Sequence, residues 1–276
     1  MSLPLPVGAA LMVEELARFR DWLIAEQRDL ELQDFLRPEV LLADWGARVA
    51  AAHAALDGFT GRLGIHGPFI GLDIDNPDPE VAPIVTRRLL TALDACAALG
   101  ATQMVIHSPY TMWDHHNFDS ARPDRPHPRE ARIAAVHDVL APVVRRGSDA
   151  GVTLVIENIA DIDPDERLAL ARSFDSAAVR VSLDTGHAHY AHGSCGAPPV
   201  DHFVNRAGSM LAHVHLQDAD GHGDRHWAPG RGTVSWHAVF AALAALPQRP
   251  NMVLELADSG HIPAAMAYLA GEGLAR

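Results

Sequence analysis

The sequence contains no lysine: all 22 of its basic residues are arginine, against 35 acidic residues, so the formal net charge is −13 at pH 7. The absence of lysine excludes a Schiff-base lysine, a pyridoxal phosphate anchor and the lysine of a P-loop. The acidic balance, with no run of arginines, also disfavours contact with phosphate backbones, because such contact draws on clustered basic side chains. We therefore expect no nucleic-acid partner.

Cysteine and long apolar runs are scarce as well. Two cysteines, Cys96 and Cys195, cannot build a disulfide framework, so a reducing, cytoplasmic setting is expected. Cys96 stands in an apolar helical pattern and is expected in the core. No window approaches about 18 consecutive apolar residues, and the N-terminal segment lacks the basic leader region of a signal peptide. We expect no membrane partner.

No glycine-rich phosphate loop follows the first strand-like run, which weakens the case for a doubly wound open sheet. The chain instead alternates strand-like and helix-like segments. The strand-like runs are 6–12, 29–35, 62–69, 101–109, 151–159, 179–187, 211–218 and 250–258. The clearest segments with helical spacing are 81–98, 129–150 and 235–246. Eight such units in 276 residues, 48% of them hydrophobic, predict an α/β fold: a single (β/α)8 TIM barrel over residues 1–276.

Groups that can bind a metal stand at the carboxyl ends of six consecutive predicted strands, where the active sites of such barrels lie. They are His66, His107, Glu157, Asp184, His215 and Glu255. Any one of them could be a hydrogen-bonded structural residue, but six at one rim would form an acidic, partly desolvated basin that a divalent cation neutralises. His187 is expected to join this basin, whereas His189 and His192 are expected in an exposed turn.

Further candidates lie near the same rim. His213 alternates with His215 on one side of a strand and is expected one layer deeper, below the site. Asp224 and His226, two residues apart in the loop after the seventh predicted strand, are candidates for another metal. The longest non-periodic loop, 110–128, is expected to act as a lid or binding loop.

Four rim residues are candidates for substrate contact: Trp113, Arg225, Trp227 and Arg231. Either tryptophan could stack on a sugar ring, and either arginine could hold a substrate phosphate. Plain loop anchoring for the tryptophans and surface salt bridges for the arginines are the alternatives.

Four short motifs stand in order along the chain: IEN at 156–158, LDTGH at 183–187, HVHLQD at 213–218 and LEL at 254–256. In this order and spacing they resemble the xylose-isomerase-like TIM-barrel superfamily, over roughly residues 62–258. That superfamily holds sugar and sugar-phosphate isomerases and epimerases, and AP endonucleases of the endonuclease IV type.

The two branches of the superfamily imply different ligand sets. Resemblance to the D-tagatose 3-epimerase type implies one divalent ion on Glu157, Asp184, His215 and Glu255. The two glutamates would then exchange protons at a carbon next to a carbonyl, and His187 would contact the substrate. Resemblance to the endonuclease IV group implies three zinc ions, with Glu157 bridging two of them and a metal-bound hydroxide attacking phosphorus. The nine matching positions are His66, His107, Glu157, Asp184, His187, His215, Asp224, His226 and Glu255.

The sequence therefore favours a metal-dependent sugar or sugar-phosphate isomerase or epimerase, with Glu157 and Glu255 as catalytic residues. One to three divalent ions are expected, zinc first, with manganese or magnesium as alternatives. A multinuclear-zinc hydrolase of a small phosphoester is the second hypothesis, and DNA repair is the third. A non-enzymatic metal-binding protein would lack a substrate-sized cleft. A small-molecule sugar or phosphorylated compound is the expected partner, and a homo-oligomer is left open.

Overall fold

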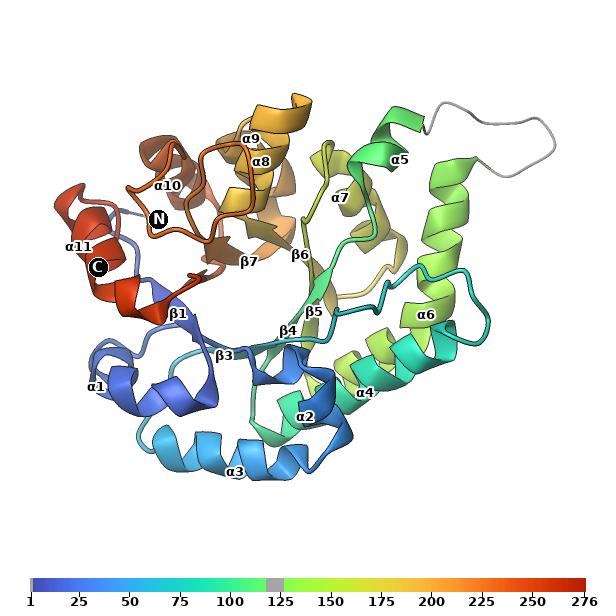
Figure 1. Ribbon diagram of the computed structural model, residues 1–276, viewed down its shortest axis with the longest axis horizontal. Coiled ribbons are helices and arrows are strands. Elements are labelled where there is room, and N and C mark those ends of the chain that lie inside the picture. Colours follow the sequence, from blue (N-terminus) through green and yellow to red (C-terminus); the bar gives the residue numbers. More distant parts are fainter. Residues whose placement is uncertain (1, 118–126) are drawn as a thin grey trace.

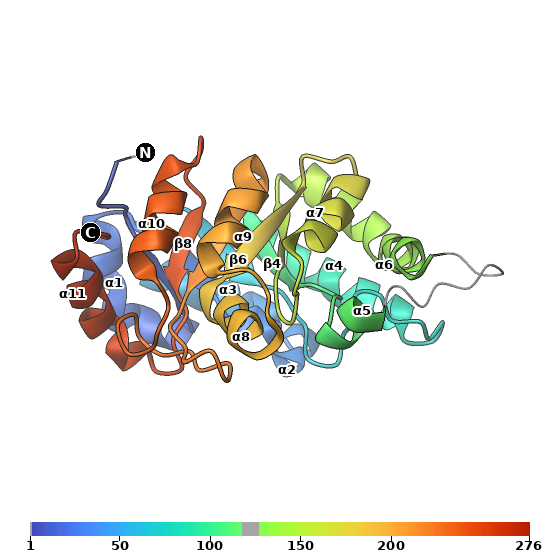
Figure 2. The same ribbon diagram turned by 90° about the horizontal axis from the view of Figure 1, so that it is seen from above.

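The computed structural model describes residues 2–117 and 127–276. Eight parallel strands pair in sequence order, and the eighth pairs with the first, so that they close a barrel inside a layer of helices (Figures 1 and 2). The strands are β1 (Gly8–Leu11), β2 (Leu30–Leu32), β3 (Leu63–His66), β4 (Gln103–His107), β5 (Thr153–Glu157), β6 (Val179–Asp184), β7 (Leu211–Leu216) and β8 (Asn251–Leu254). The predicted (β/α)8 barrel is confirmed.

A helix follows each strand and packs on the outside of the barrel. In chain order these helices are α1 (Leu16–Ala25), α3 (Trp45–Ala55), α4 (Ala82–Ala98), α6 (Pro128–Ala150), α7 (Pro164–Ser173), α9 (Val200–Ala207), α10 (Trp236–Ala245) and α11 (Ile262–Gly271). The connections also hold α2 (Pro38–Leu42), α5 (Met112–Asn117) and α8 (Thr185–Cys195). The three helices predicted from periodicity agree with α4, α6 and α10 to within one residue at each end.

The strands are almost wholly buried, because side chains fill the barrel interior on one face and helices cover the other. Helix α6 shows how local sequence sets the element boundaries. Its first residue is Pro128, whose ring suits the first turn, and Gly151 follows its end with a φ of 70°. Helices α4 and α6 lie side by side on the outer surface (Figures 1 and 2).

Two local predictions need correction. The turn expected after Asp184 is wrong, since residues 185–195 form α8 and place His189 and His192 on a helix. The Asp184 carboxylate caps α8 by accepting the backbone N–H of His187 at 2.7 Å. The segment 110–128 is not a uniform loop: its first residue, Tyr110, is buried, and α5 follows. Residues 118–126 of that segment lie outside the described part of the chain.

Both cysteines are free thiols. Cys96 is buried in α4, as predicted, and Cys195 is half-buried at the end of α8. Within residues 2–117 and 127–276, no helix is both long enough and apolar enough to traverse a lipid bilayer.

Candidate metal centre

The nine residues predicted to bind metal gather at the carboxyl end of the barrel. Strand pairing explains part of this, because His107 lies opposite Glu157 on β4 and β5, and Asp184 lies opposite His215 on β6 and β7. Glu255 directly follows β8. Ligand atoms within 4.8 Å of one another divide the nine into three groups: His66, His107 and Glu157; Glu157, Asp184, His215 and Glu255; His187, Asp224 and His226.

Glu157 belongs to two of these groups. Its Oε2 atom lies 3.6 Å from Nε2 of His66 and 3.7 Å from Nε2 of His107. Its Oε1 atom lies 2.8 Å from Nδ1 of His215, which is also 3.4 Å from Oε2 of Glu255. The carboxylate thus presents one oxygen to each group, which is the arrangement of a bridging ligand.

The third group comes from the start of α8 and from the loop after β7. Asp224 lies between two imidazoles, with Oδ2 at 3.3 Å from Nε2 of His187 and Oδ1 at 3.1 Å from Nε2 of His226. His226 adopts a φ of 47°, an uncommon backbone conformation for a residue other than glycine. Asp224 and His226, two residues apart in the loop, thus contact each other through their side chains.

Three of the histidines have one ring nitrogen held by a backbone carbonyl. Each Nδ1–H donates to an oxygen, which leaves the Nε2 lone pair for the cluster. The pairs are His66 with Gly67 at 2.8 Å, His187 with Asn158 at 2.9 Å and His226 with Glu255 at 3.2 Å. This is the support that metal-binding imidazoles receive from their surroundings in proteins.

Gln217, which was not predicted as a site residue, connects two of the groups. Its amide nitrogen donates to Oδ1 of Asp184 at 3.1 Å and to Oδ1 of Asp224 at 2.9 Å, and its amide oxygen accepts the backbone N–H of His226 at 2.8 Å. Gly186 makes room for it, since a Cβ atom there would lie 2.1 Å from the Gln217 amide oxygen. A side chain at this glycine of the LDTGH motif would therefore displace the Gln217 amide from these hydrogen bonds.

Glu31, also overlooked, lies beneath the centre. It is a buried carboxylate on β2, with Oε1 at 3.0 Å from Nε2 of His215 and Oε2 at 3.2 Å from Nε2 of His213. His213 in turn contacts the hydroxyl of Ser182 at 2.9 Å, so it does lie one layer deeper than His215. The sequence feature that could have indicated Glu31 is its position as a single acidic residue between two leucines in a buried strand.

Two buried carboxylate oxygens in the centre have no hydrogen-bond partner: Oε2 of Glu157 and Oδ2 of Asp184. Such atoms cost free energy unless something binds them. Carboxylate and imidazole groups together are the donors that zinc and related divalent ions take. The residues therefore fit a divalent metal ion.

The charges of the cluster perturb one another strongly. Burial opposes ionisation of Glu157, but the surrounding histidines, His215 first, hold its pKa well below the usual value. Burial likewise opposes the charge on His215, yet Glu255 and Glu31 raise its pKa well above the usual value. Burial prevails at His107, lowering its pKa to about 3, and at Glu255, where it raises the pKa. Protons and a cation would compete for the same lone pairs.

A cavity of about 360 Å³ opens onto the centre. Seven of the nine predicted residues line it, together with Gln33, Leu36, Phe69 and Ile159. The four predicted substrate residues do not line it. Trp113 is 76% exposed on α5, Arg225 pairs with Asp220 at 3.0 Å and lies 5.6 Å over the Trp227 ring, and Arg231 is exposed. Their substrate roles stay predictions.

Comparison with known proteins now decides the family. Residues 30–274 match the family model described as xylose isomerase-like TIM barrel. The chain belongs to this family. Solved structures that share its fold include several sugar epimerases.

Three known proteins are similar to this chain. The TTHB071 protein of Thermus thermophilus, in a structure obtained by soaking with ZnCl2, is 27% identical, with a TM-score of 0.70 over 98% of this chain and 99% of that one. A D-tagatose 3-epimerase-like protein shares the fold, with a TM-score of 0.75 at 18% identity over 97% and 96% of the two chains. D-psicose 3-epimerase of Ruminiclostridium cellulolyticum is 24% identical over 208 residues, 75% of this chain. The chain spans 61% to 66% of the length of two curated relatives, this epimerase included.

Proposed function

We propose that this protein is a metal-dependent sugar or sugar-phosphate isomerase or epimerase. The observation that carries the proposal is the pair Glu157 and Glu255, which both line the 360 Å³ cavity and both approach Nδ1 of His215. Two carboxylates on one small cavity can remove a proton from a substrate carbon and return one to it. Epimerases among the relatives support the same reaction class.

Glu157, Asp184, His215 and Glu255 would hold one divalent ion, and the other two groups would hold up to two more. We propose zinc, because imidazole is the commonest ligand type among the nine residues; manganese and magnesium are the alternatives. A relative whose structure was obtained by soaking with ZnCl2 supports this choice. When bound, the metal polarises the carbonyl and hydroxyl oxygens of the sugar.

The protein side chains would do the remaining work. Glu255 is held by the amide of Gln33, whose Nε2 donates to Oε1 at 2.5 Å, so that Oε2 faces the cluster. One glutamate would remove the proton from the carbon next to the carbonyl, and the other would return a proton to the same or the neighbouring carbon. His187, which lines the cavity, would contact the substrate, and Phe69 would exclude water from one wall.

Solvent isotope exchange tests the proposal. The metal-loaded protein would be incubated in heavy water with ketoses, aldoses and their phosphates, and each sugar would be analysed by mass spectrometry. We expect deuterium at the carbon next to the carbonyl of at least one sugar. Absence of exchange in the whole panel, together with cleavage of a phosphoester, would replace the isomerase with a hydrolase.

The hydrolase remains the second candidate because of one observation: Glu157 offers its two oxygens to two separate ligand groups. Such sharing suits a multinuclear site, and multinuclear zinc sites are common in phosphoester hydrolysis. A small phosphoester is then the proposed substrate, since the net charge of −13 opposes binding to duplex DNA.

A further inference from the structure

A second cavity adjoins the metal cavity. Its volume is about 470 Å³, larger than the 360 Å³ over the metal centre, and the two share Phe69, His107 and Ile159 in their linings. The remaining walls come from residues after β3, from the segment between β4 and α5, from the loop after β5, and from α5 and α6. The two cavities therefore meet at these three shared residues.

The described residues that line the second cavity carry excess negative charge. Asp73, Asp75 and Asp114 line it, and Arg132 is the arginine among its lining residues. Arg132 pairs with Asp75 at 3.3 Å and with Asp114 at 2.9 Å, and its guanidinium lies 5.9 Å over the Tyr110 ring. Because two carboxylates already neutralise the charge of Arg132, the cavity would repel a phosphate.

We propose that this cavity is a subsite for a second, neutral, hydroxyl-rich ring attached to the sugar at the metal centre. Carboxylate oxygens accept hydrogen bonds from sugar hydroxyls, which suits Asp73 and Asp75. The size agrees, since each cavity by itself lies within the roughly 300–1,000 Å³ of small-molecule sites. The subsite rests on the proposed function, and it narrows the substrate class from sugars and sugar phosphates to unphosphorylated glycosides.

Calorimetry with three probes tests the subsite. The zinc-loaded protein would be titrated with D-fructose, with lactulose, which adds a neutral galactose ring, and with D-fructose 6-phosphate. We expect lactulose to bind about tenfold more tightly than fructose, a gain that corresponds to about 1.4 kcal/mol. Equal affinities for fructose and lactulose would overturn the subsite.

Ala160, whose small side chain lines the second cavity, offers the blocking variant. In Ala160→Phe the advantage of lactulose over fructose should disappear, because the added ring occupies the space. The exposed Thr111 offers a second blocking variant, Thr111→Trp, should Ala160→Phe fail to fold. The protein could instead bind D-fructose 6-phosphate about tenfold more tightly than D-fructose, and Ala160→Phe could remove this difference. That result would contradict the assignment of the subsite to a neutral ring.

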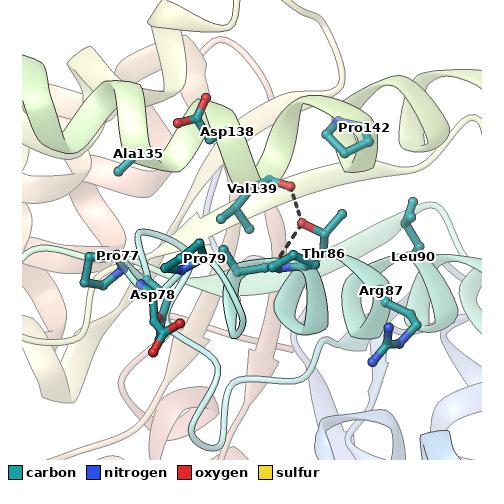
Figure 3. A pocket seen from close by; sticks show the side chains of 13 residues that line it. Pro77, Asp78, Pro79, Thr86, Arg87, Leu90, Ala135, Asp138, Val139 and Pro142 are labelled. Carbon is teal, nitrogen blue, oxygen red and sulfur yellow. Dashed lines mark hydrogen bonds between the residues drawn. The ribbon is translucent and has the colours of Figure 1, made fainter.

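A groove on the outer surface provides the matched control. It lies between α4 and α6, has a volume of about 720 Å³, and is lined by Ala135, Val139 and Pro142 among others (Figure 3). Thr86 on α4 donates to the carbonyl of Val139 on α6 at 3.0 Å, so the groove is part of the helical layer outside the barrel. Ala135→Phe should leave the lactulose preference unchanged. If Ala160→Phe and Ala135→Phe both lost the preference for lactulose to the same extent, the proposal would be overturned.

Isotope exchange separates the two proposals. If Ala160→Phe abolished lactulose binding and no sugar exchanged deuterium, the result would support the subsite and reject the isomerase. Exchange in fructose, combined with no preference for lactulose, would support the isomerase and reject the subsite. Failure of every sugar to bind would reject both.

Discussion

Oε1 of Glu31 lies 3.0 Å from Nε2 of His215. The other nitrogen of the same ring, Nδ1, lies 2.8 Å from Glu157 and faces the ligand cluster. A proton on Nε2 directed at Glu31 therefore leaves the Nδ1 lone pair for a metal. Carboxylates in this position orient the imidazole and increase its basicity.

Replacing Glu31 with Gln should weaken zinc binding at the centre by about 10–100-fold, because the amide keeps the shape but removes the charge behind His215. Competition with a fluorescent zinc chelator would measure the change. Glu130→Gln, at an exposed position of α6, is the matched control and should leave zinc affinity unaltered. Equal zinc affinity in wild type and Glu31→Gln would remove Glu31 from the metal centre.

More than one ion should bind per chain when zinc is abundant. Among the described residues, four groups could hold a metal; the nine predicted ligands make up three of them, and the fourth, Glu31, His213 and His215, shares His215 with one of these. Elemental analysis of the saturated protein should therefore approach three zinc ions. His107→Ala should reduce this number by one, whereas His53→Ala, on the exposed face of α3, should not. Chelation should also lower the melting temperature, because a ligand that binds only the folded state stabilises it. A maximum of one ion in the saturated wild type contradicts this prediction.

Glu255→Gln should slow solvent isotope exchange by about 10²–10⁴-fold, the usual contribution of a positioned general base. The amide keeps one oxygen for a metal, so zinc content should fall less than the exchange rate. Glu272→Gln, at an exposed position after α11, serves as control. Retention of full exchange in Glu255→Gln would show that this glutamate does not carry the proton.

Glu166 on α7 gives a pH dependence outside the metal centre. Burial raises its pKa from 4.5 to about 6, although Arg129 lies 3.2 Å away. Its protonated form is favoured on folding, so its contribution to stability is complete below about pH 4.5 and is lost as the pH rises through about 6. In metal-free protein, the free energy of unfolding of Glu166→Gln, relative to wild type, should therefore increase by about 1 kcal/mol as the pH rises from about 4.5 to about 6. Urea unfolding at each pH would measure this difference. A difference that does not change with pH would contradict the assignment.

The protein should not bind duplex DNA with submicromolar affinity at physiological salt. The chain has no lysine and a net charge of −13, and DNA binding depends on basic side chains that replace counterions. Fluorescence anisotropy with an intact duplex and with one that contains an abasic site would measure this. Submicromolar binding of the abasic duplex would instead promote the DNA repair hypothesis.

The order of segments along the chain was enough to predict the barrel, because strand and helix periodicities alternate and polar residues close six consecutive strands. The nine candidate ligands follow from the same rule, since strand ends meet at one rim. Helix α8 was missed although Asp184 and Gly196 are ordinary boundary residues, because the apolar run before Asp184 suggested that the strand continued. Glu31 was missed because it contacts His215 from 184 residues away, a proximity that only barrel closure creates.

The carboxylate of Glu157 links two of the ligand groups. Because its Oε2 faces His66 and His107 while its Oε1 faces His215, an ion on one side would fix the rotation of the carboxylate for the ion on the other side. An ion at one of these two groups would therefore change the affinity of the other group for its ion. Zinc would not fill the two groups independently, whereas the third group, which does not contain Glu157, lacks this link.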